Sequence, residues 1–568
     1  MRRRTAWIIF TVATLLLGTL FLWPLWQVVQ GGFRMDGVWT FKYLAGVFKN
    51  PVYVEGLWNS ARLAAGTTLL ATLLALPLAW LSNRFEFPGK SFLTALLLVP
   101  MILPPFVGAI GFQQLLGPYG ALNAWLGLGP VDWLGKGRYF GVIVLQALSL
   151  YPILYLNLSA ALANIDPAME EAAANLGASV FTRFRRVVMP LMMPGFFAGG
   201  TIIFIWSFTE LGTPLMLNYY RCAPVQVYDA LKEIGTSPFP YALVFVMLAC
   251  SLLLYSATRL LFGRQAYAMQ SKAATQYAPN RARGWQALLV MLPFIAVCAA
   301  ALLPHLAVIL TSFSAPGGWY HTGWPTQFTG VHYLDALGHE MTVSSIRNSL
   351  WFSSLAVGIN LALGTAIAFV VVRSTIPLRG LLDAITMVPL AVPGLVMAFG
   401  YLAISSYLGN LEWVKGSDVL SGMLDVRTNP TLFLVIAYAV RRLPYMVRTV
   451  TAGLQQTSVT LEESAANLGA APFTVARRIT LPLIMANVIA GILLAFAFSM
   501  LEVSDSLMLA QRADYYPITK TIYELFQLIG TGKFVAAALG VWAMAFLAVT
   551  ILGAGLLLGK KMGSLFRL

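Results

Sequence analysis

Apolar residues fill long unbroken runs of this chain, for example at 63–81 and 288–303. A helix needs about 20 apolar residues to cross the roughly 30 Å hydrocarbon core of a membrane, whereas barrel strands alternate apolar and polar residues over about 10 positions. A spanning helix also satisfies all of its backbone polar groups within lipid. The pattern therefore predicts an all-α transmembrane protein.

Twelve such runs are present, in two sets of six. The predicted spans are 7–30, 58–82, 92–116, 139–163, 191–215, 240–262, 284–312, 346–372, 380–408, 430–454, 483–510 and 535–559. Residues 263–284, rich in Gln, Ala, Ser and Arg, are predicted to be a cytoplasmic linker between a first half, 1–262, and a second half, 285–568. The first run follows three arginines and lacks a small-residue cleavage site, so we interpret it as an uncleaved span.

The distribution of charge predicts the orientation. The net charge is +15, although only 10% of residues are charged and 58% are apolar. Nucleic-acid binding is one explanation of the basic excess, but basic cytoplasmic loops of a membrane protein explain it better, because positive residues concentrate there. With the N-terminus inside, alternate loops hold basic clusters such as Arg185-Arg186 and Lys560-Lys561, and the other loops hold most of the acids. Both termini are therefore predicted to be cytoplasmic.

The two halves repeat one another. Asn59-Ser60 recurs as Asn348-Ser349, and at the same offset Arg84 matches Arg373 and Gly111 matches Gly400. A second register, three residues longer, matches Asn175-Leu176-Gly177 to Asn467-Leu468-Gly469 and Glu210 to Glu502. Prolines predict a break in the third span of each half, at Pro100, Pro104, Pro105, Pro389 and Pro393. Six spans per half make the halves parallel repeats, with a pathway expected at their interface. A duplication retained only for packing is the alternative.

The best-matched polar stretch follows the fourth span of each half, at 164–190 and 456–482. Its first copy contains Glu170, Glu171, Ala172, Ala173, Gly177, Arg185, Arg186 and Pro190, and its second contains Glu462, Glu463, Ala465, Gly469, Arg477, Arg478 and Pro482. Acids suit the N-terminus of a helix, and a glycine can end a helix in a left-handed conformation. We therefore expect two short exposed helices in each copy, the second carrying the arginines, with the proline starting the fifth span.

Both copies resemble the EAA loop of binding-protein-dependent ABC importers, whose pattern is E-A-A-x3-G-x9-I-x-L-P. The first copy departs from it at Val187 and Met189, and the second at Ser464. The resemblance implies that the loops bind two copies of a cytoplasmic ABC ATPase, and it assigns this coupling role to the residues named above. Packing of the short helices on the bilayer surface is the structural alternative, which we disfavour because they carry little apolar face.

Over its whole length the chain resembles the fused, twelve-span permeases of the ferric-iron importer family, and the stretch 441–445, Arg-Arg-Leu-Pro-Tyr, fits that group. The resemblance implies the type I ABC importer permease fold, a bacterial inner membrane and a periplasmic or lipid-anchored solute-binding protein. It also implies that ATP and Mg are bound by the partner ATPase. Sister groups carry thiamine, 2-aminoethylphosphonate or polyamines, so the substrate stays open. A stand-alone secondary transporter also has twelve spans, but it does not need these loops.

The sequence offers no motif for catalysis. The phosphate-binding pattern G-x4-G-K-[S/T] does not occur, which argues against ATPase activity in this chain. The four histidines and three cysteines lack the spacing of a metal site. No catalytic residue, metal ligand or cofactor is therefore predicted.

Several ionisable residues fall inside predicted spans, where they usually face the bundle interior or a water-filled path. Glu210 and Glu502 occupy equivalent positions, and Asp505 lies one turn beyond. These acids either line the pathway or form a polar contact that holds the halves together. Two carboxylates near one axis would favour a cationic substrate. Arg441 and Arg442 either snorkel to the cytoplasmic interface or pair with an acid inside the bundle, and we favour a structural role for them.

Overall fold

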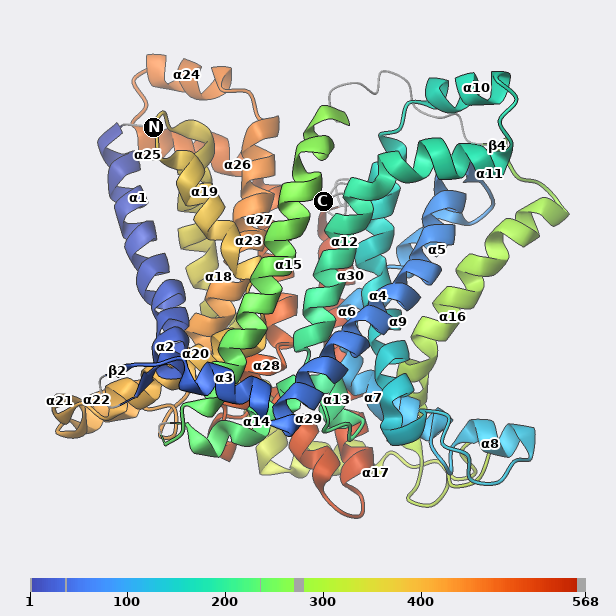
Figure 1. Ribbon diagram of the computed structural model, residues 1–568. Helices are drawn as coiled ribbons and strands as arrows, with labels where there is room; N and C mark the ends of the chain where they lie inside the picture. The colour runs from blue at the N-terminus through green and yellow to red at the C-terminus, as the bar shows by residue number, and fades with distance from the viewer. Residues whose placement is uncertain (1–2, 36–37, 235, 270–279, 559–568) are drawn as a thin grey trace.

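The computed structural model describes residues 3–35, 38–234, 236–269 and 280–558, which form one bundle of long helices with short helices at both ends (Figure 1). The elements up to the middle of the chain are α1 (Arg3–Leu17), η1 (Gly18–Leu22), α2 (Trp23–Phe33), β1 (Arg34–Met35), β2 (Val38–Trp39), α3 (Lys42–Lys49), α4 (Pro51–Arg84), β3 (Phe85–Glu86), α5 (Lys90–Leu96), α6 (Val99–Ile102), α7 (Pro105–Leu116), α8 (Ala121–Leu126), η2 (Lys136–Arg138), α9 (Tyr139–Ala163), α10 (Pro167–Asn175), α11 (Val180–Arg183), η3 (Phe184–Val188), α12 (Met189–Thr209), α13 (Gly212–Met216), α14 (Ala223–Asp229), η4 (Ala230–Glu233) and α15 (Phe239–Met269).

The second half continues the same pattern, and the η segments throughout are short 3₁₀ or π turns. Its elements are β4 (Asn280–Arg281), α16 (Trp285–Phe313), α17 (Val331–Gly338), α18 (Glu340–Arg373), α19 (Arg379–Met387), η5 (Val388–Leu390), α20 (Gly394–Gly409), α21 (Glu412–Lys415), α22 (Asp418–Leu424), α23 (Thr431–Gln456), α24 (Thr460–Asn467), α25 (Pro472–Val475), η6 (Ala476–Thr480), α26 (Leu481–Leu483), α27 (Met485–Met500), α28 (Ser504–Leu509), η7 (Ala513–Tyr515), α29 (Ile518–Gln527) and α30 (Gly532–Leu558). The strands form two small pairs, β1–β2 antiparallel and β3–β4 parallel.

The helices account for the twelve predicted spans. Eight helices within the described ranges are long and apolar enough to cross a membrane, and three bent pairs raise that number to eleven. This criterion omits α23, whose sequence contains Arg441, Arg442 and Arg448, although its 26 residues are long enough to cross. With α23 included, the number of spans agrees with the sequence pattern.

The third span of each half is broken, as its prolines predict. The segments Lys90–Met101 and Pro105–Leu126 meet at 97°, and Arg379–Leu390 and Gly394–Gly409 meet at 98°. A 76° bend at Ile484 was not predicted, and it lies at the start of the predicted span 483–510. The stretches 164–190 and 456–482 are called the coupling loops below. The two spans that follow them also end earlier than expected, α12 at Thr209 and α27 at Met500. Glu210 and Glu502 therefore lie just beyond helix ends.

The first helix of each half packs against the other half. Helices α1 and α2 of the first half pack on α18, α19 and α20 of the second half. Helix α16 of the second half packs on α5 and α7 of the first half (Figure 1). The matched glycines permit this approach, because a Cβ at Gly111 would clash with the carbonyl oxygen of Pro304, and one at Gly400 would lie 2.8 Å from that of Pro24. The halves defined along the sequence are thus intertwined in space.

The segment between the halves is helical at its start. Helix α15 continues to Met269, into the predicted linker 263–284, and α16 begins at Trp285. Residues 270–279 of that linker lie outside the described residues. The following strand, β4, pairs with β3 at the end of α4.

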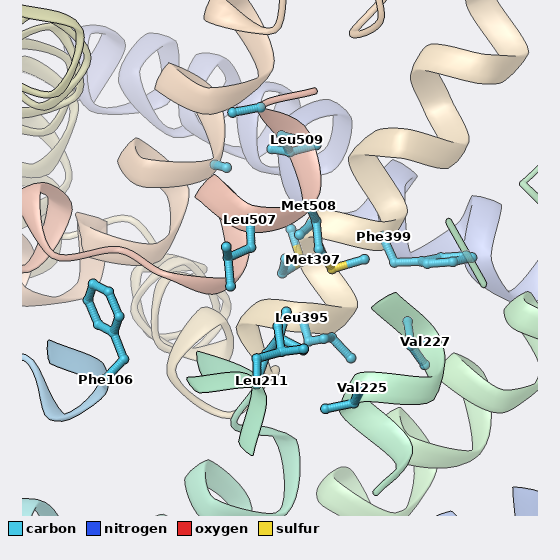
Figure 2. Packing of buried hydrophobic residues seen from close by; sticks show 14 of the residues in the cluster. Phe106, Leu211, Val225, Val227, Leu395, Met397, Phe399, Leu507, Met508 and Leu509 are labelled. Atoms are coloured by element: carbon cyan, nitrogen blue, oxygen red, sulfur yellow. The ribbon is translucent and has the colours of Figure 1, made fainter. Parts of the chain in front are cut away.

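An apolar core joins the two halves at their interface. One continuous cluster of buried side chains includes Phe106 of α7 and Leu211 from the first half, and Leu395 of α20 and Leu507 of α28 from the second. Figure 2 shows these residues converging from several helices. Burial of this apolar surface fixes the halves against each other and places Glu210 and Glu502 beside the seam.

Candidate coupling loops and buried acids

Each coupling loop begins with a short helix that ends at a left-handed glycine. Helix α10 is capped by Asp166, whose carboxylate accepts a hydrogen bond from the Ala168 N–H at 3.0 Å. Gly177 and Gly469 have φ of 82° and 84°, as predicted. In both copies the N–H groups of this glycine and of the next residue bond back into the helix in a Schellman pattern, for example Ala178 N to Ala173 O at 3.0 Å.

The second helix of each loop differs from the expectation. Helix α11 runs through the π turn η3 into α12 without a break, so Pro190 lies inside one continuous helix, Val180–Thr209. The other loop has the same π turn, η6, before Pro482, and the helix bends only after α26. A π turn relaxes the usual hydrogen-bond pattern at the point where proline lacks an N–H. The arginine pairs Arg185-Arg186 and Arg477-Arg478 lie on these turns and are exposed.

The outer surface of each loop combines acidic and apolar side chains. Glu171 and Glu463 are exposed, Ala172 is exposed, and Ala173 and Ala465 are half-buried. Leu176 and Leu468, at the turns, are 89% and 90% exposed, and no sequence pattern marked them for this role.

The expectation of little apolar surface on the loops was therefore wrong. Phe181 and Phe473 are also exposed, at equivalent places on the two copies. Both α10 and α24 lie at one extreme end of the bundle, beyond the ends of the long helices (Figure 1). Exposed apolar residues rimmed by charges are typical of a surface that binds a protein or a membrane, so they fit ATPase docking and no longer count against packing on the bilayer.

The first glutamate of each loop faces inward rather than outward. Glu170 is buried and forms an ion pair with Arg84, and Glu462 is half-buried and accepts a hydrogen bond from Arg373 Nε at 3.0 Å. The two adjacent glutamates of each copy therefore occupy different environments, and only Glu171 and Glu463 are available to a partner.

Glu210 is surrounded by neutral polar groups. Its carboxylate accepts hydrogen bonds from the backbone N–H of Thr213 at 2.9 Å and from Gln146 Nε2 at 3.2 Å. It thereby caps the short helix α13 at the N-terminus. Val503 of the second half lies next to Gly212, so this site is close to the seam between the halves.

Glu502, in contrast, is held by two arginines. Arg441 contacts Glu502 at 2.5 Å and Asp505 at 3.1 Å, and Arg442 forms an ion pair with the other oxygen of Glu502. The arginines therefore pair with acids inside the bundle, and the snorkelling interpretation is wrong for both. Arg448, one to two turns along α23, is half-exposed and lies 3.6 Å from Asp383.

These contacts overturn the inference of two unbalanced carboxylates near one axis. Two carboxylates and two guanidinium groups balance one another around Glu502, because a buried charge is tolerated only when it is paired. Glu210 is the acid of the predicted pair that forms no ion pair among the described residues. Of the two predicted pathway acids, Glu210 alone still indicates a cationic substrate.

The family is shown by comparison with known proteins. The family described as "Binding-protein-dependent transport system inner membrane component" matches residues 69–267 and again residues 360–556. The chain belongs to this family. The two matches correspond to the two repeats, so the protein is a fused, two-half permease of the ABC importer class.

Three relatives illustrate the range of this permease family. A probable ABC transporter permease of Sinorhizobium fredii is 26% identical over 480 residues, covering 82% of this chain and 81% of its own. A ferric transport system permease of Actinobacillus pleuropneumoniae is 25% identical over 478 residues, 81% of this chain and 64% of its own. A molybdenum transport system permease of Escherichia coli is 33% identical over 208 residues, 34% of this chain and 89% of its own.

The permease has a cavity between its halves at the end opposite to the coupling loops. Its volume is about 700 Å³. The polar and charged residues that line it are Tyr228, Asp229 and Lys232 of the first half and Ser405, Ser406, Asn410, Asp425, Arg427, Gln511 and Lys520 of the second. Leu507 connects this lining to the apolar core of the seam.

Lys520 joins the two halves at this cavity. It is 5% exposed, and its ammonium group donates to the Tyr228 hydroxyl at 3.1 Å and lies 2.8 Å from Glu524. Burial, and then the charges of Glu524 and Asp229, raise the pKa of Tyr228 to about 12, so the phenol is neutral at pH 7. In the sequence, the one available sign of this cavity was that polar residues recur near the last predicted loops.

Proposed function

We propose that this permease forms the pathway of an importer of ferric iron, driven by two copies of a separate cytoplasmic ABC ATPase. The observation that carries the proposal is the pair of equivalent, exposed coupling loops at one end of the bundle. Each loop offers an acidic residue, an exposed leucine and two arginines in the same arrangement. Two such surfaces need two partner surfaces, and a dimeric ATPase that binds ATP and Mg supplies them. The chain itself binds no cofactor in this proposal.

The cavity at the opposite end is proposed as the point where the solute enters. It lies between the halves, and its volume of about 700 Å³ suits a small solute. A periplasmic or lipid-anchored binding protein would deliver the solute there. The coupling-loop end would then face the cytoplasm of a bacterium, with both termini on that side of the inner membrane, in agreement with its basic residues.

Ferric iron is favoured by the relatives that extend along most of this chain. The ferric permease covers 81% of it, whereas the molybdenum permease covers 34%, which is less than one half of the fused chain. Glu210 is the group offered to a cationic cargo in this proposal, since it is a carboxyl group beside the seam without a basic partner among the described residues. An oxyanion such as molybdate is the second candidate, because of the molybdenum relatives.

Uptake by cells tests the substrate. Cells that carry the permease with its ATPase and binding protein should accumulate radioactive iron supplied as a ferric complex, and excess molybdate should not compete. Accumulation of molybdate in place of iron would contradict the ferric assignment and leave the importer assignment intact.

Co-purification tests the coupling loops. The wild-type permease should retain the ATPase during purification in detergent, and Glu171→Lys together with Glu463→Lys should release it. Glu55→Lys, an exposed change outside the loops, is the matched control and should retain it. Retention in the loop variant would contradict the docking assignment.

A further inference from the structure

The coupling loops are connected to the long helices α4 and α18 by matched ion pairs. Arg84 is the last residue of α4 and pairs with Glu170, and Arg373 is the last residue of α18 and pairs with Glu462 at 3.0 Å. All four side chains are 19% exposed or less. Such a contact is screened less by solvent than a surface ion pair, and removing one partner leaves an uncompensated charge.

Further contacts fix both arginines. The Arg84 guanidinium lies 3.8 Å from the ring centre of Trp80, one turn earlier on α4. Arg373 also donates to the carbonyl oxygens of Leu454 and Thr457, at 3.0 Å each. The geometry at the arginines is therefore set by the helices, and the loop glutamates follow it.

The opposite ends of α4 and α18 hold the helices that line the cavity. In the first half, the Ser60 hydroxyl accepts a hydrogen bond from the N–H of Ala223, the first residue of α14, at 2.9 Å. In the second half, the Ser349 hydroxyl accepts from the N–H of Ile518, the first residue of α29, at 2.7 Å.

The asparagine beside each serine makes an equivalent contact. Asn59 donates to the carbonyl oxygen of Arg221 at 2.9 Å, and Asn348 donates to that of Asp514 at 2.8 Å. The pairs Asn59-Ser60 and Asn348-Ser349 are thus a clamp at the outer end of each long helix. In both halves the serine precedes the arginine at the end of the helix by the same number of residues, which corresponds to about 36 Å along the helix axis.

We propose that α4 and α18 transmit movement from the coupling loops to the outer cavity, with Arg84–Glu170 and Arg373–Glu462 as the inner attachments and the Asn-Ser pairs as the outer ones. A helix with both ends attached moves as a rigid body, so displacement of a loop by the ATPase displaces α14 or α29. The proposal rests on the proposed function, because it takes the loops to be the ATPase-binding surface. These residues are positioning residues, and none of them contacts the solute.

Charge exchange at the first attachment tests the proposal. Arg84→Glu or Glu170→Arg alone should lower the iron transported per ATP hydrolysed by about 2- to 30-fold, the range for residues that couple two sites. The combination Arg84→Glu with Glu170→Arg should restore most of it. Arg373 also binds backbone carbonyls, so the same exchange in the second half should restore less.

Two variants control the experiment. Lys90→Glu breaks an ion pair with Glu86 at the same end of the bundle, and it should leave transport per ATP unchanged. Arg84→Gln removes the charge without repulsion, so it gives the same readout if the charge-reversed chain does not fold. ATPase retention is measured in every variant.

A second readout follows the cavity directly. Ser406→Cys, placed in a chain with Cys250→Ser, reports access to the cavity through its rate of labelling by a membrane-impermeant thiol reagent. Trapping the ATPase with nucleotide should change this rate in the parent chain, and Arg84→Glu should reduce the change, because only the attachment of α18 then remains. Ser60→Ala should also reduce it, by loosening the outer clamp.

The outcomes separate the two proposals. If the wild-type chain does not retain an ATPase, the proposed function fails. If the variants retain an active ATPase but charge exchange does not restore transport, or if nucleotide changes labelling in Arg84→Glu as much as in the parent chain, the transmission through α4 is wrong and the proposed function stands.

Discussion

Glu210 and Glu502 hold equivalent positions in the two halves, yet their surroundings differ in charge. Glu210 accepts hydrogen bonds from an amide side chain and a backbone N–H, whereas Glu502 is held by Arg441 and Arg442. In the register of the repeat, the arginines take the places of Ser149 and Leu150 of the first half. Asp505 likewise takes the place of Thr213.

This difference shows that one position in a duplicated fold can hold a carboxylate in two ways. Neutral hydrogen bonds satisfy Glu210, and a cluster of opposite charges satisfies Glu502, because either arrangement offsets the cost of desolvation. The first arrangement leaves a carboxyl group without a basic partner near the seam, and in the second both acids contact an arginine. The coupling loops do not differ in this way, because the first helix of each loop ends at a left-handed glycine and each loop exposes a leucine.

The largest effect is expected at the charged cluster. Glu502→Gln leaves Arg441 and Arg442 with too little negative charge in the bundle interior, so we expect a loss of about 3–5 kcal/mol in the free energy of unfolding. Denaturation of the purified permease in detergent measures this loss. A change below about 1 kcal/mol, the value of an ordinary hydrogen bond, would contradict the importance of the ion pairs.

Substituting residues of the first half at the matching positions of the second half tests the comparison more closely. Arg441→Ser, Arg442→Leu and Asp505→Thr together remove the charged partners of Glu502, while Tyr438 keeps the place that Gln146 has in the first half. Because no uncompensated cation remains, we expect this triple variant to lose less stability than Glu502→Gln, within about 2 kcal/mol of wild type. The same denaturation experiment compares the two variants. A triple variant that is less stable than Glu502→Gln would show that the halves are not interchangeable here.

Glu210→Gln should affect transport more than stability. The amide oxygen can still accept the N–H of Thr213, so the expected loss of stability is at most about 1 kcal/mol. Removal of the carboxylate charge should slow iron uptake several-fold without loss of the ATPase. Uptake is measured against Glu55→Gln, an exposed acid on an outer segment. Normal uptake by Glu210→Gln would return this residue to a packing role.

A small and equal effect in both halves is expected where the halves agree. Gly177→Val and Gly469→Val force a branched side chain into a left-handed backbone, at a cost of about 1–2 kcal/mol each, and nothing crowds either position. Both should loosen the ATPase to a similar degree, as measured by co-purification. Gly422→Val, where φ is ordinary and space is open, serves as the control. A strong effect at one glycine only would break the equivalence of the loops.

The sequence predicted the features that depend on local pattern. Apolar run length predicted the spans, prolines predicted the breaks at 97° and 98°, and glycine predicted the left-handed helix ends. The equivalence of Glu210 and Glu502 was also visible, because the repeat fixes their place after the coupling loops. These predictions need only the chain near each residue.

Features that depend on distant segments could not be predicted in this way. The pairing of Arg441 with Glu502 joins α23 to the end of α27, and the packing of α2 and α16 on the opposite halves depends on close approach at Gly400 and Gly111. The repeat contained a hint of the Arg84–Glu170 contact, since both residues recur, but recurrence alone did not show that they meet.

ATP hydrolysis in proteoliposomes tests the central claim most directly. The purified permease alone should hydrolyse no ATP. Addition of the separate ATPase should start hydrolysis, and addition of the iron-loaded binding protein should accelerate it and drive iron into the vesicle lumen. Hydrolysis by the permease alone, or iron uptake that continues without the ATPase, would contradict the account.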